Sequence, residues 1–412
     1  MSDDIKSTPR TPPKQPVPPP KPQRWRIVAT LIAALAVAVA VAGEAGVNSR
    51  QGPSAVQGSV GRTPAPISTP SSPVTVTTPI NLPPDTESVS FALVGDITFS
   101  NYDTLPVGGM DRVFDYVRGD LESDVTMGNL ETVIGNVRAT KCAPRAAGDG
   151  SPNNCYTFVA HPDAAKALSN AGFAAVNLAN NHSNDAGAAG VADTQAALKA
   201  AGVKWTGKPG QIEYIHLDDQ DLTVAILGFA PYSSSANLLD INGAKQLVAK
   251  AKKKADLVIV YMHVGAEGAN QQHVRAGSEV FLGEDRGNPI AFSHAVIDAG
   301  ADLVFGSGPH VLRGMQWYKG KLIAYSLGNF SGYNTLTYTG VFGISAILHV
   351  TLDQKGNFLV GSLTPIVRVT PGVPKIDVTG TAISQIKALS QADFAGNGAV
   401  KISNDGTIQP PA

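Results

Sequence analysis

The chain has 412 residues, which is long enough for two or three domains or for one large domain with appended segments. Its 32 basic and 33 acidic residues leave a net charge of −1, and this balance excludes a surface built for nucleic-acid phosphates. We therefore expect no nucleic-acid partner.

The N-terminal segments have no pattern of a globular domain. Residues 1–25 are polar and rich in proline, which predicts a disordered leader. Residues 26–43 carry an uncharged stretch at the short end of the length that spans a membrane. Basic residues before it and Glu44 after it predict a single-pass anchor with the C-terminal part outside the cytoplasm. A cleaved signal peptide, which would give a secreted protein, is the alternative.

Residues 44–85 are rich in Pro, Ser and Thr and predict an extended linker. Farther on, Cys142 and Cys155 lie in a segment of Pro, Gly, Asp and Asn that is typical of a loop. Outside the cytoplasm, a disulfide between them is expected. A metal-binding pair is the weaker alternative because there is no CxxC spacing.

Apolar runs that end in polar residues recur through residues 86–375, which we take as the globular domain. The runs are 89–96, 125–129, 174–179, 257–263, 303–310 and 322–329. Helix-like segments lie between them, at 162–170, 194–201, 243–254 and 291–299. This alternation predicts an α/β fold with mostly parallel strands. Residues 341–369 read as antiparallel strands, and residues 376–412 as a tail with one unassigned helical pattern, 383–395.

The polar residues at the ends of these runs predict a functional site. The central stretch runs from Ala174 to Gly187, where a buried strand stops at Asn180, Asn181 and His182. Ligands bind at the carboxyl ends of strands in open α/β sheets. The other strand-end residues are Asp96, Asn129, Glu131, His263, His310 and Asn329. Carboxylate oxygen and imidazole nitrogen together suit zinc, manganese or iron.

The remaining histidines lack this context. They lie in a loop before proline, in strand-like alternation, in a polar segment or on a helix: His161, His216, His349, His273 and His294. We expect them to be surface residues or hydrogen-bonded core residues.

Several short motifs occur in a characteristic order. They are Gly95-Asp96, Gly128-Asn-Leu-Glu131, Leu178-Ala-Asn-Asn-His-Ser-Asn-Asp-Ala-Gly187, His263-Val-Gly-Ala-Glu267, Gly300 to His310 and Tyr325-Ser-Leu-Gly-Asn-Phe330. Over about residues 88–370 the chain resembles the CapA family, which is associated with bacterial capsule and poly-γ-glutamate synthesis. That family is similar to calcineurin-like metallophosphoesterases, so the resemblance implies a four-layer α/β/β/α sandwich with metals at the strand ends.

The resemblance also implies roles for individual residues. Asp96 would be a carboxylate ligand of a first metal. Glu131 would lie in the region of a bridging carboxylate, with Asn129 as its rival. Asn181 would bind a second metal through its amide oxygen, and His182 would be a general acid. His263 and His310 would be imidazole ligands. Asn180, Asp185, Glu267 and Asn329 would support the site.

Three positions depart from the family pattern. Thr98 stands where metallophosphoesterases carry histidine, Gly308 where the CapA family usually has the first histidine of a His-Pro-His, and Val264 where many relatives carry tryptophan. Two missing imidazoles should weaken metal binding, so the site is expected to hold one metal, two loosely, or none.

Three functions follow as expectations. The first is a membrane-anchored CapA-like protein that acts in synthesis, export or attachment of an anionic envelope polymer, with the polymer or its precursor and other polymer-synthesis proteins as partners. The second is an extracytoplasmic metal-dependent hydrolase of a phosphoester or amide. The third is a non-catalytic polymer-binding module. The chain has no Gly-x-x-x-x-Gly-Lys-Ser/Thr loop, so ATP-driven polymerisation would need another protein.

Overall fold

The computed structural model describes residues 87–99, 105–142 and 155–411. The leader, membrane segment and linker expected from the sequence lie outside these residues. Among the described helices, none has the length and apolar character needed to cross a membrane.

The larger of two sheets has nine strands, in the order β18-β17-β16-β1-β2-β5-β6, with β15 pairing with β1 and β19 with β17. The strands are β1 (Ser88–Thr98), β2 (Val125–Leu130), β5 (Phe173–Asn177), β6 (Lys204–Thr206), β15 (Asn329–Gly332), β16 (Ile344–Asp353), β17 (Phe358–Val369), β18 (Val373–Ile376) and β19 (Thr407–Ile408). β1, β2, β5, β6 and β15 run parallel, whereas β16 to β19 pair antiparallel. The expected antiparallel region is therefore confirmed.

The smaller sheet has six strands in the order β13-β14-β12-β9-β8-β7. They are β7 (Glu213–Leu217), β8 (Leu222–Phe229), β9 (Leu257–His263), β12 (Leu303–Ser307), β13 (Met315–Tyr318) and β14 (Lys321–Ala324). The four inner strands are parallel and the two edge strands antiparallel. Two short ribbons pair β3 (Val133–Ile134) with β4 (Val159–Ala160), and β10 (Val280–Phe281) with β11 (Glu284–Asp285).

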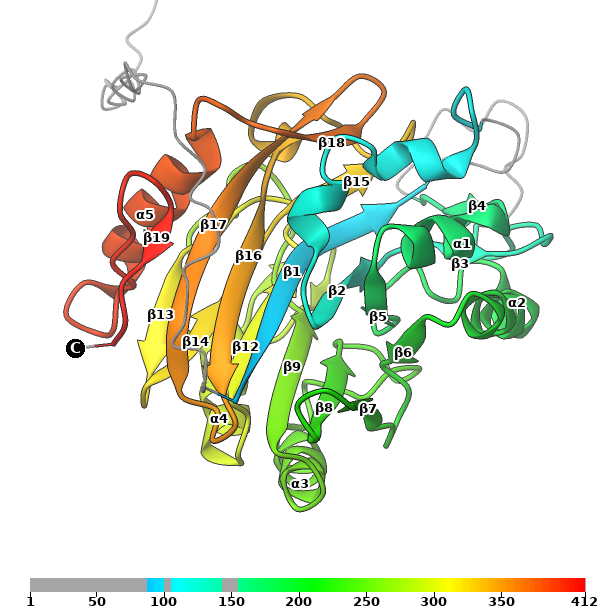
Figure 1. Cartoon of the computed structure of the whole chain (residues 1–412). Coiled ribbons are helices and arrows are strands. Elements are labelled where there is room, and N and C mark those ends of the chain that lie inside the picture. The colour runs from blue at the N-terminus through cyan, green and yellow to red at the C-terminus, as the bar shows by residue number, and fades with distance from the viewer. Residues whose placement is uncertain (1–86, 100–104, 143–154, 412) are drawn as a thin grey trace, which may run out of the picture. The chain divides into compact units, whose positions relative to one another are not determined.

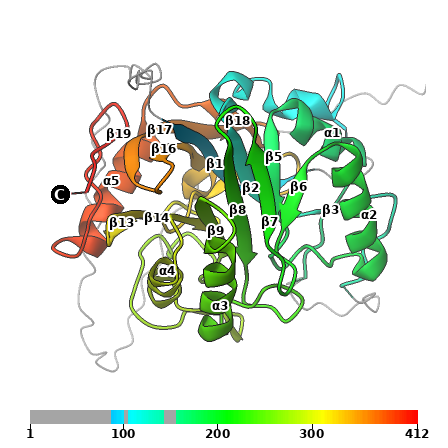
Figure 2. The ribbon, with the colours of Figure 1, turned by 60° about the horizontal axis from the view of Figure 1, so that its bottom comes forward.

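The helices cover the outer faces of the two sheets (Figures 1 and 2). On the larger sheet lie α1 (Asp163–Asn170), α2 (Gly187–Ala200), η1 (Met110–Phe114) and η2 (Arg118–Leu121); on the smaller lie α3 (Ile241–Lys252) and α4 (Pro289–Asp298). The short η3 (Gly340–Gly343) precedes β16. Caps fix two helix starts, since Asp240 accepts from the N–H of Gly243 and Asn288 from that of Ala291.

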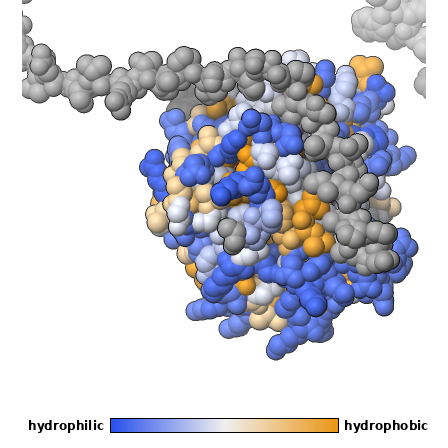
Figure 3. All heavy atoms as spheres, turned by 60° about the vertical axis from the view of Figure 1, so that its left-hand side comes forward, coloured by the Kyte–Doolittle hydropathy of each residue, from blue (hydrophilic) through white to orange (hydrophobic). Residues whose placement is uncertain are grey.

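Hydrophobic side chains form three layers of core. Phe91 and Leu93 of the larger sheet pack with Ile259 and Phe305 of the smaller one, so the two sheets lie face to face. A second cluster lies between the larger sheet and its helices, and a third between the smaller sheet and α3 and α4. The mixed α/β fold is thus confirmed, and its layers run helix, sheet, sheet, helix. On the face in Figure 3, hydrophilic residues cover most of the described surface.

Two segments differ from the sequence-based expectation. The run 322–329 is not one strand: β14 ends at Ala324, and Asn329 begins β15 in the other sheet. Between them the chain turns at Gly328, which has a positive φ of 66°. The residues after 375 are not a tail, because α5 (Thr381–Phe394) contacts β13, β16 and β17, and Ile383 and Ile386 join the core between the sheets.

Candidate metal centre

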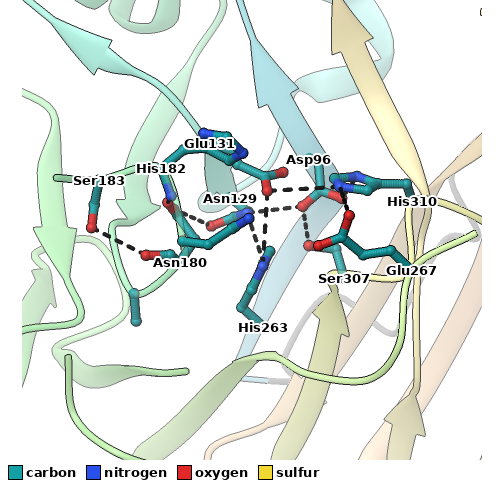
Figure 4. Close-up of polar contacts among 12 residues, drawn as sticks. Asp96, Asn129, Glu131, Asn180, His182, Ser183, His263, Glu267, Ser307 and His310 are labelled. Carbon is teal, nitrogen blue, oxygen red and sulfur yellow. Dashed lines mark hydrogen bonds and ion pairs between the residues drawn. The ribbon is translucent and has the colours of Figure 1, made fainter. Parts of the chain in front are cut away.

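The structure brings the predicted strand-end residues together between the carboxyl ends of the two sheets (Figure 4). In the larger sheet, Asp96 of β1 is the register partner of Asn129 in β2 and of Asn329 in β15. In the smaller sheet, His263 of β9 pairs with Ser307 of β12. Gly95 permits this assembly, because a Cβ there would lie 1.8 Å from the carbonyl oxygen of Gly328.

Asp96, Glu131 and His263 form the centre of the site. All three are buried, and one potential ligand atom of each lies within 4.8 Å of the others. His263 Nε2 is 3.8 Å from Glu131 Oε1. Among the described residues, neither oxygen of Glu131 nor His263 Nε2 has a hydrogen-bond partner. Buried polar atoms without partners are costly, so these atoms fit a bound cation.

The electrostatics of these three residues also fit a cation. Burial, with a further contribution from Asp96, raises the pKa of Glu131 well above its usual value. Burial lowers the pKa of His263 to about 3, so its imidazole is neutral and keeps a lone pair. Burial would raise the pKa of Asp96, but the hydrogen bond and charge of His310 lower it to about 2. A divalent ion would relieve the repulsion between the two carboxylates.

His310 lies beside this group and pairs with Asp96. Its Nδ1 is 3.1 Å from Asp96 Oδ2 and 2.8 Å from Asn329 Oδ1, and its Nε2 is 3.9 Å from Glu131 Oε1. Burial would lower the pKa of His310, but Glu131 and Asp96 raise it to about 10. Without a metal, His310 therefore supplies the positive charge of the site.

Glu267 extends the site on the far side of His310. Glu267 Oε2 is 3.7 Å from His310 Nε2, and its Oε1 accepts a hydrogen bond of 2.9 Å from Arg286 Nη1. Arg286 is 5% exposed, and the sequence had not singled it out. Nothing in the local sequence marks Arg286, because its link to the site is made only by folding.

A network of amides decides how Asn129 is oriented. Asn177 and Asn180 both donate to Asn129 Oδ1, at 2.8 and 3.0 Å. Asn129 Nδ2 in turn donates to Asp96 Oδ1 at 2.8 Å. The oxygen of Asn129 is therefore already used, whereas both oxygens of Glu131 are free to bind a metal. Asn177 was missed by the sequence reasoning, although its place as the last residue of β5 was a usable signal.

Asp96 is also held by a short chain of hydrogen bonds from Ser307 and Tyr261. Ser307 Oγ donates to Asp96 Oδ1, and the Tyr261 hydroxyl hydrogen-bonds with Ser307 Oγ. Both residues lie in the smaller sheet, so they join it to β1. Neither had been predicted as a site residue, since serine and tyrosine inside apolar strands carry no distinctive pattern.

His182 lies at the rim of the site, held by its own loop. Its Nδ1 is 2.7 Å from Asp185 Oδ2, and its ring centroid is 4.3 Å from that of Phe158. Burial lowers the pKa of His182 despite the hydrogen bond to Asp185. Asn181 is not in the central group of three, but its Oδ1 is buried and has no hydrogen-bond partner among the described residues.

Residues 90–333 match the family described as "Bacterial capsule synthesis protein PGA_cap". The chain belongs to this family. The resemblance to CapA proteins expected from the motifs is confirmed.

The chain is also similar to proteins whose names refer to capsule or PGA biosynthesis. The chain is 32% identical over 270 residues to "Capsule biosynthesis protein CapA" of Bacillus anthracis, covering 60% of each chain. It is 30% identical over 262 residues to "PGA biosynthesis protein CapA" of Bacillus subtilis, covering 59% of this chain and 63% of the relative. The chain thus spans less than two thirds of the length of either relative.

Among solved structures, the chain is similar to a 5'-nucleotidase precursor from Thermus thermophilus. The sequence identity is 15% and the TM-score is 0.35, with 74% of this chain and 59% of the other covered.

Two of the three departures that the resemblance implied, Thr98 and Gly308, have a structural explanation. Thr98 Oγ1 hydrogen-bonds with Thr335 Oγ1 instead of serving the central group. Gly308 has a φ of 119°, a conformation that side chains rarely adopt. A Cβ at Gly308 would also lie 3.0 Å from the backbone nitrogen of Val264. Histidine at position 308 would therefore strain this backbone.

The expected disulfide is confirmed: Cys142 and Cys155 are bonded, with their Cα atoms 5.8 Å apart. The backbone nitrogens of Thr140 and Lys141 both donate to the carbonyl oxygen of Asp185. The disulfide-bonded segment is thereby tied to the loop that carries His182.

The other histidines lie outside the centre. His294 hydrogen-bonds with Gln316, His349 with Thr364 and His273 with Asp393. His216 is exposed on β7, and Nδ1 of His161 lies 3.3 Å from Oδ2 of Asp163.

Proposed function

We propose that this protein acts in the synthesis, export or attachment of an anionic polymer of the bacterial cell envelope. Membership of the capsule synthesis family supports this function, as do the names of the two Bacillus relatives. Poly-γ-glutamate is the polymer that these names favour. Its partners would be the polymer or a precursor, together with other polymer-synthesis proteins.

A chemical role is supported by the buried group of Asp96, Glu131 and His263, in which both oxygens of Glu131 and Nε2 of His263 have no hydrogen-bond partner among the described residues. These residues would hold a divalent ion, manganese, iron or zinc, with His310 and Asn181 within the same site. Such an ion lowers the pKa of bound water and polarises the bond under attack. One or two ions are consistent with this set. The fold would then be a metallophosphoesterase-type sandwich, and the reaction a hydrolysis or transfer at a phosphoester or amide.

The side chains around the centre have separable tasks. Ser307 and Asn129 hold Asp96 in place through hydrogen bonds to the same oxygen, Oδ1. Asp185 holds Nδ1 of His182, so the other ring nitrogen of His182 can exchange a proton with a substrate. Arg286 donates a hydrogen bond to one oxygen of Glu267 and holds this side chain in place. The other oxygen of Glu267 faces Nε2 of His310 and can orient that ring.

We also propose that the folded domain works outside the cytoplasm, either anchored through residues 26–43 or secreted. The disulfide supports this location, because such bonds persist mainly in oxidising compartments.

The first test is metal content. The 412-residue chain and the variants Asp96→Asn and His263→Ala would be analysed for manganese, iron and zinc, with His294→Ala as control. We expect about one to two equivalents in the wild type and in the control, and loss in both site variants. A wild-type protein that takes up no added metal would refute the metal centre and favour the non-catalytic polymer-binding role.

The second test is genetic. Deletion of the gene should change the envelope polymer, and His294→Ala should restore it while Asp96→Asn should not. An unchanged polymer inventory under all growth conditions would refute the proposed function.

A further inference from the structure

Two hollows adjoin beside the metal centre. The larger, of about 660 Å³, borders Asn180 and Asn181. The smaller, of about 280 Å³, lies between the start of α2 and Lys208. Asn184 and Ser234 line both hollows, so the two hollows adjoin, and we refer to them together as the groove. A groove of this size takes more than one unit of a small-unit polymer.

Two of the three charged residues that line the larger hollow, Lys141 and Glu284, have ion-pair partners. Lys141 Nζ lies 3.2 Å from Asp185 Oδ1. Glu284 Oε2 lies 3.1 Å from Arg286 Nε, and Asp285 Oδ1 accepts from the backbone nitrogen of Gly287. This part of the groove therefore keeps the negative charge of Asp285, so the positive charge that attracts an anionic polymer has to come from the smaller hollow or from a bound metal. The Tyr232 hydroxyl offers a hydrogen bond, since it is buried without a hydrogen-bond partner among the described residues.

The smaller hollow carries a cation that has no acidic partner among the described residues. Lys208 is exposed, and its Nζ donates to the neutral Gln195 Oε1 at 2.8 Å. No described carboxylate lies within ion-pair distance of Lys208. Apolar Leu178, Ala188 and Val191 line the same hollow. An aliphatic surface beside one cation fits a unit with a short methylene chain and a carboxylate.

We propose that this groove binds an extended stretch of anionic polymer, which runs from the larger hollow next to Asn180 and Asn181 to the smaller hollow, where the carboxylate of a more distant unit binds Lys208. This inference rests on the proposed function and adds a binding subsite to it. The smaller hollow is then a subsite that binds a polymer unit away from the bond that reacts. Short chains that fill only the larger hollow should not sense Lys208.

The test is a length series. Binding of γ-glutamyl oligomers of increasing length to the 412-residue chain would be measured by calorimetry for Lys208→Gln and for its control Lys199→Gln. Lys199 is an exposed lysine of α2 that does not line either hollow. We expect Lys208→Gln to lower the affinity for long oligomers about three- to fivefold and to leave the affinity for the shortest oligomers unchanged. At high salt the affinities of the variant and the wild type for long oligomers should converge, because the charge of Lys208 is screened. Lys199→Gln should match the wild type.

A second pair of variants tests the groove by shape. Ala188→Trp would fill the smaller hollow, whereas Ala189→Trp places the same bulk on the next exposed residue, outside both hollows. Ala188→Trp should abolish the gain of affinity with length, and Ala189→Trp should retain it. If the wild type binds long oligomers and both Lys208→Gln and Ala188→Trp bind them equally well, the groove proposal is wrong while the proposed function stands. A wild-type protein that binds no oligomer of any length would refute the groove proposal and poly-γ-glutamate as its polymer, while the genetic test would still decide the proposed function.

Discussion

His182 Nδ1 lies 2.7 Å from Asp185 Oδ2, the same oxygen that accepts the backbone N–H of Phe158. An ionised carboxylate only accepts hydrogen bonds, so Nδ1 must carry the proton and Nε2 keeps its lone pair. Since burial lowers the pKa of His182, the neutral ring is the resting state at neutral pH. The oriented imidazole would thus accept a proton before it donates one, which would refine the general-acid role that the resemblance implies.

Asp185→Asn should release this orientation. In the wild type, nitrogen NMR should show His182 as the Nδ1–H tautomer, and in the variant a mixture of both tautomers. The variant should also lose about 1–3 kcal/mol of unfolding free energy, because the Phe158 N–H and His182 lose an ionised acceptor. A wild-type spectrum of the Nε2–H tautomer would contradict this arrangement.

Glu131→Gln should separate metal binding from stability. In the wild type, metal at about 100 times its dissociation constant should add about 2.7 kcal/mol to the unfolding free energy. The variant should lose this increment. Without metal it should melt at the same temperature as the wild type or higher, because a buried carboxyl that repels Asp96 has been replaced by a neutral amide. A metal-dependent rise in melting temperature that persists in the variant would exclude Glu131 as a ligand.

Gly95→Ala should damage the fold at the centre itself. The new Cβ would meet the carbonyl oxygen of Gly328, which also accepts the N–H of Asp96 at 2.9 Å. We expect a loss of about 3 kcal/mol or more in unfolding free energy, together with weaker metal binding. Gly119→Ala is the matched control, since nothing lies within 4 Å of a Cβ there. Denaturant titration of both variants would check this, and equal stability would contradict the close approach.

Removal of the disulfide should destabilise the chain through loop closure. Cys142→Ser with Cys155→Ser opens a link of sequence separation 13, which corresponds to about 3 kcal/mol. Chemical denaturation of the double variant should match that of the reduced wild type. Unchanged stability in both would show that this loop is equally constrained without the bond.

His349 should make stability depend on pH. Burial lowers its pKa to about 4, against about 6.5 in an unfolded chain. As pH falls below about 6.5, the unfolded state binds a proton on His349 before the folded state does. The free energy of unfolding therefore keeps its full value above about pH 6.5 and decreases as pH falls toward about 4. Between about pH 7 and 4 the wild type should lose about 2 kcal/mol more than His349→Gln, allowing for partial exposure. Parallel pH profiles for the two proteins would contradict this.

Much of the site could be predicted from the chain alone. Asp96, His263 and the Asn-Asn-His stretch stand where apolar runs stop, and parallel strands bring their carboxyl ends to one edge. The disulfide between the two cysteines could likewise be predicted, because they are separated by a short polar loop. These features depend on local sequence and on the regular geometry of strands, so no long-range contact was needed to infer them.

The tertiary structure decided the rest. The resemblance implied Glu131 as the bridging carboxylate with Asn129 as its rival, and only the hydrogen bonds from Asn177 and Asn180 show that the oxygen of Asn129 is already occupied. Ser307 reaches Asp96 only because the two sheets pack face to face. Residues 322–329 looked like one strand, because a change of sheet at Gly328 depends on packing around Gly95 and not on apolar pattern. Contacts between distant segments leave no periodicity in a single sequence, and for that reason only folding could reveal them.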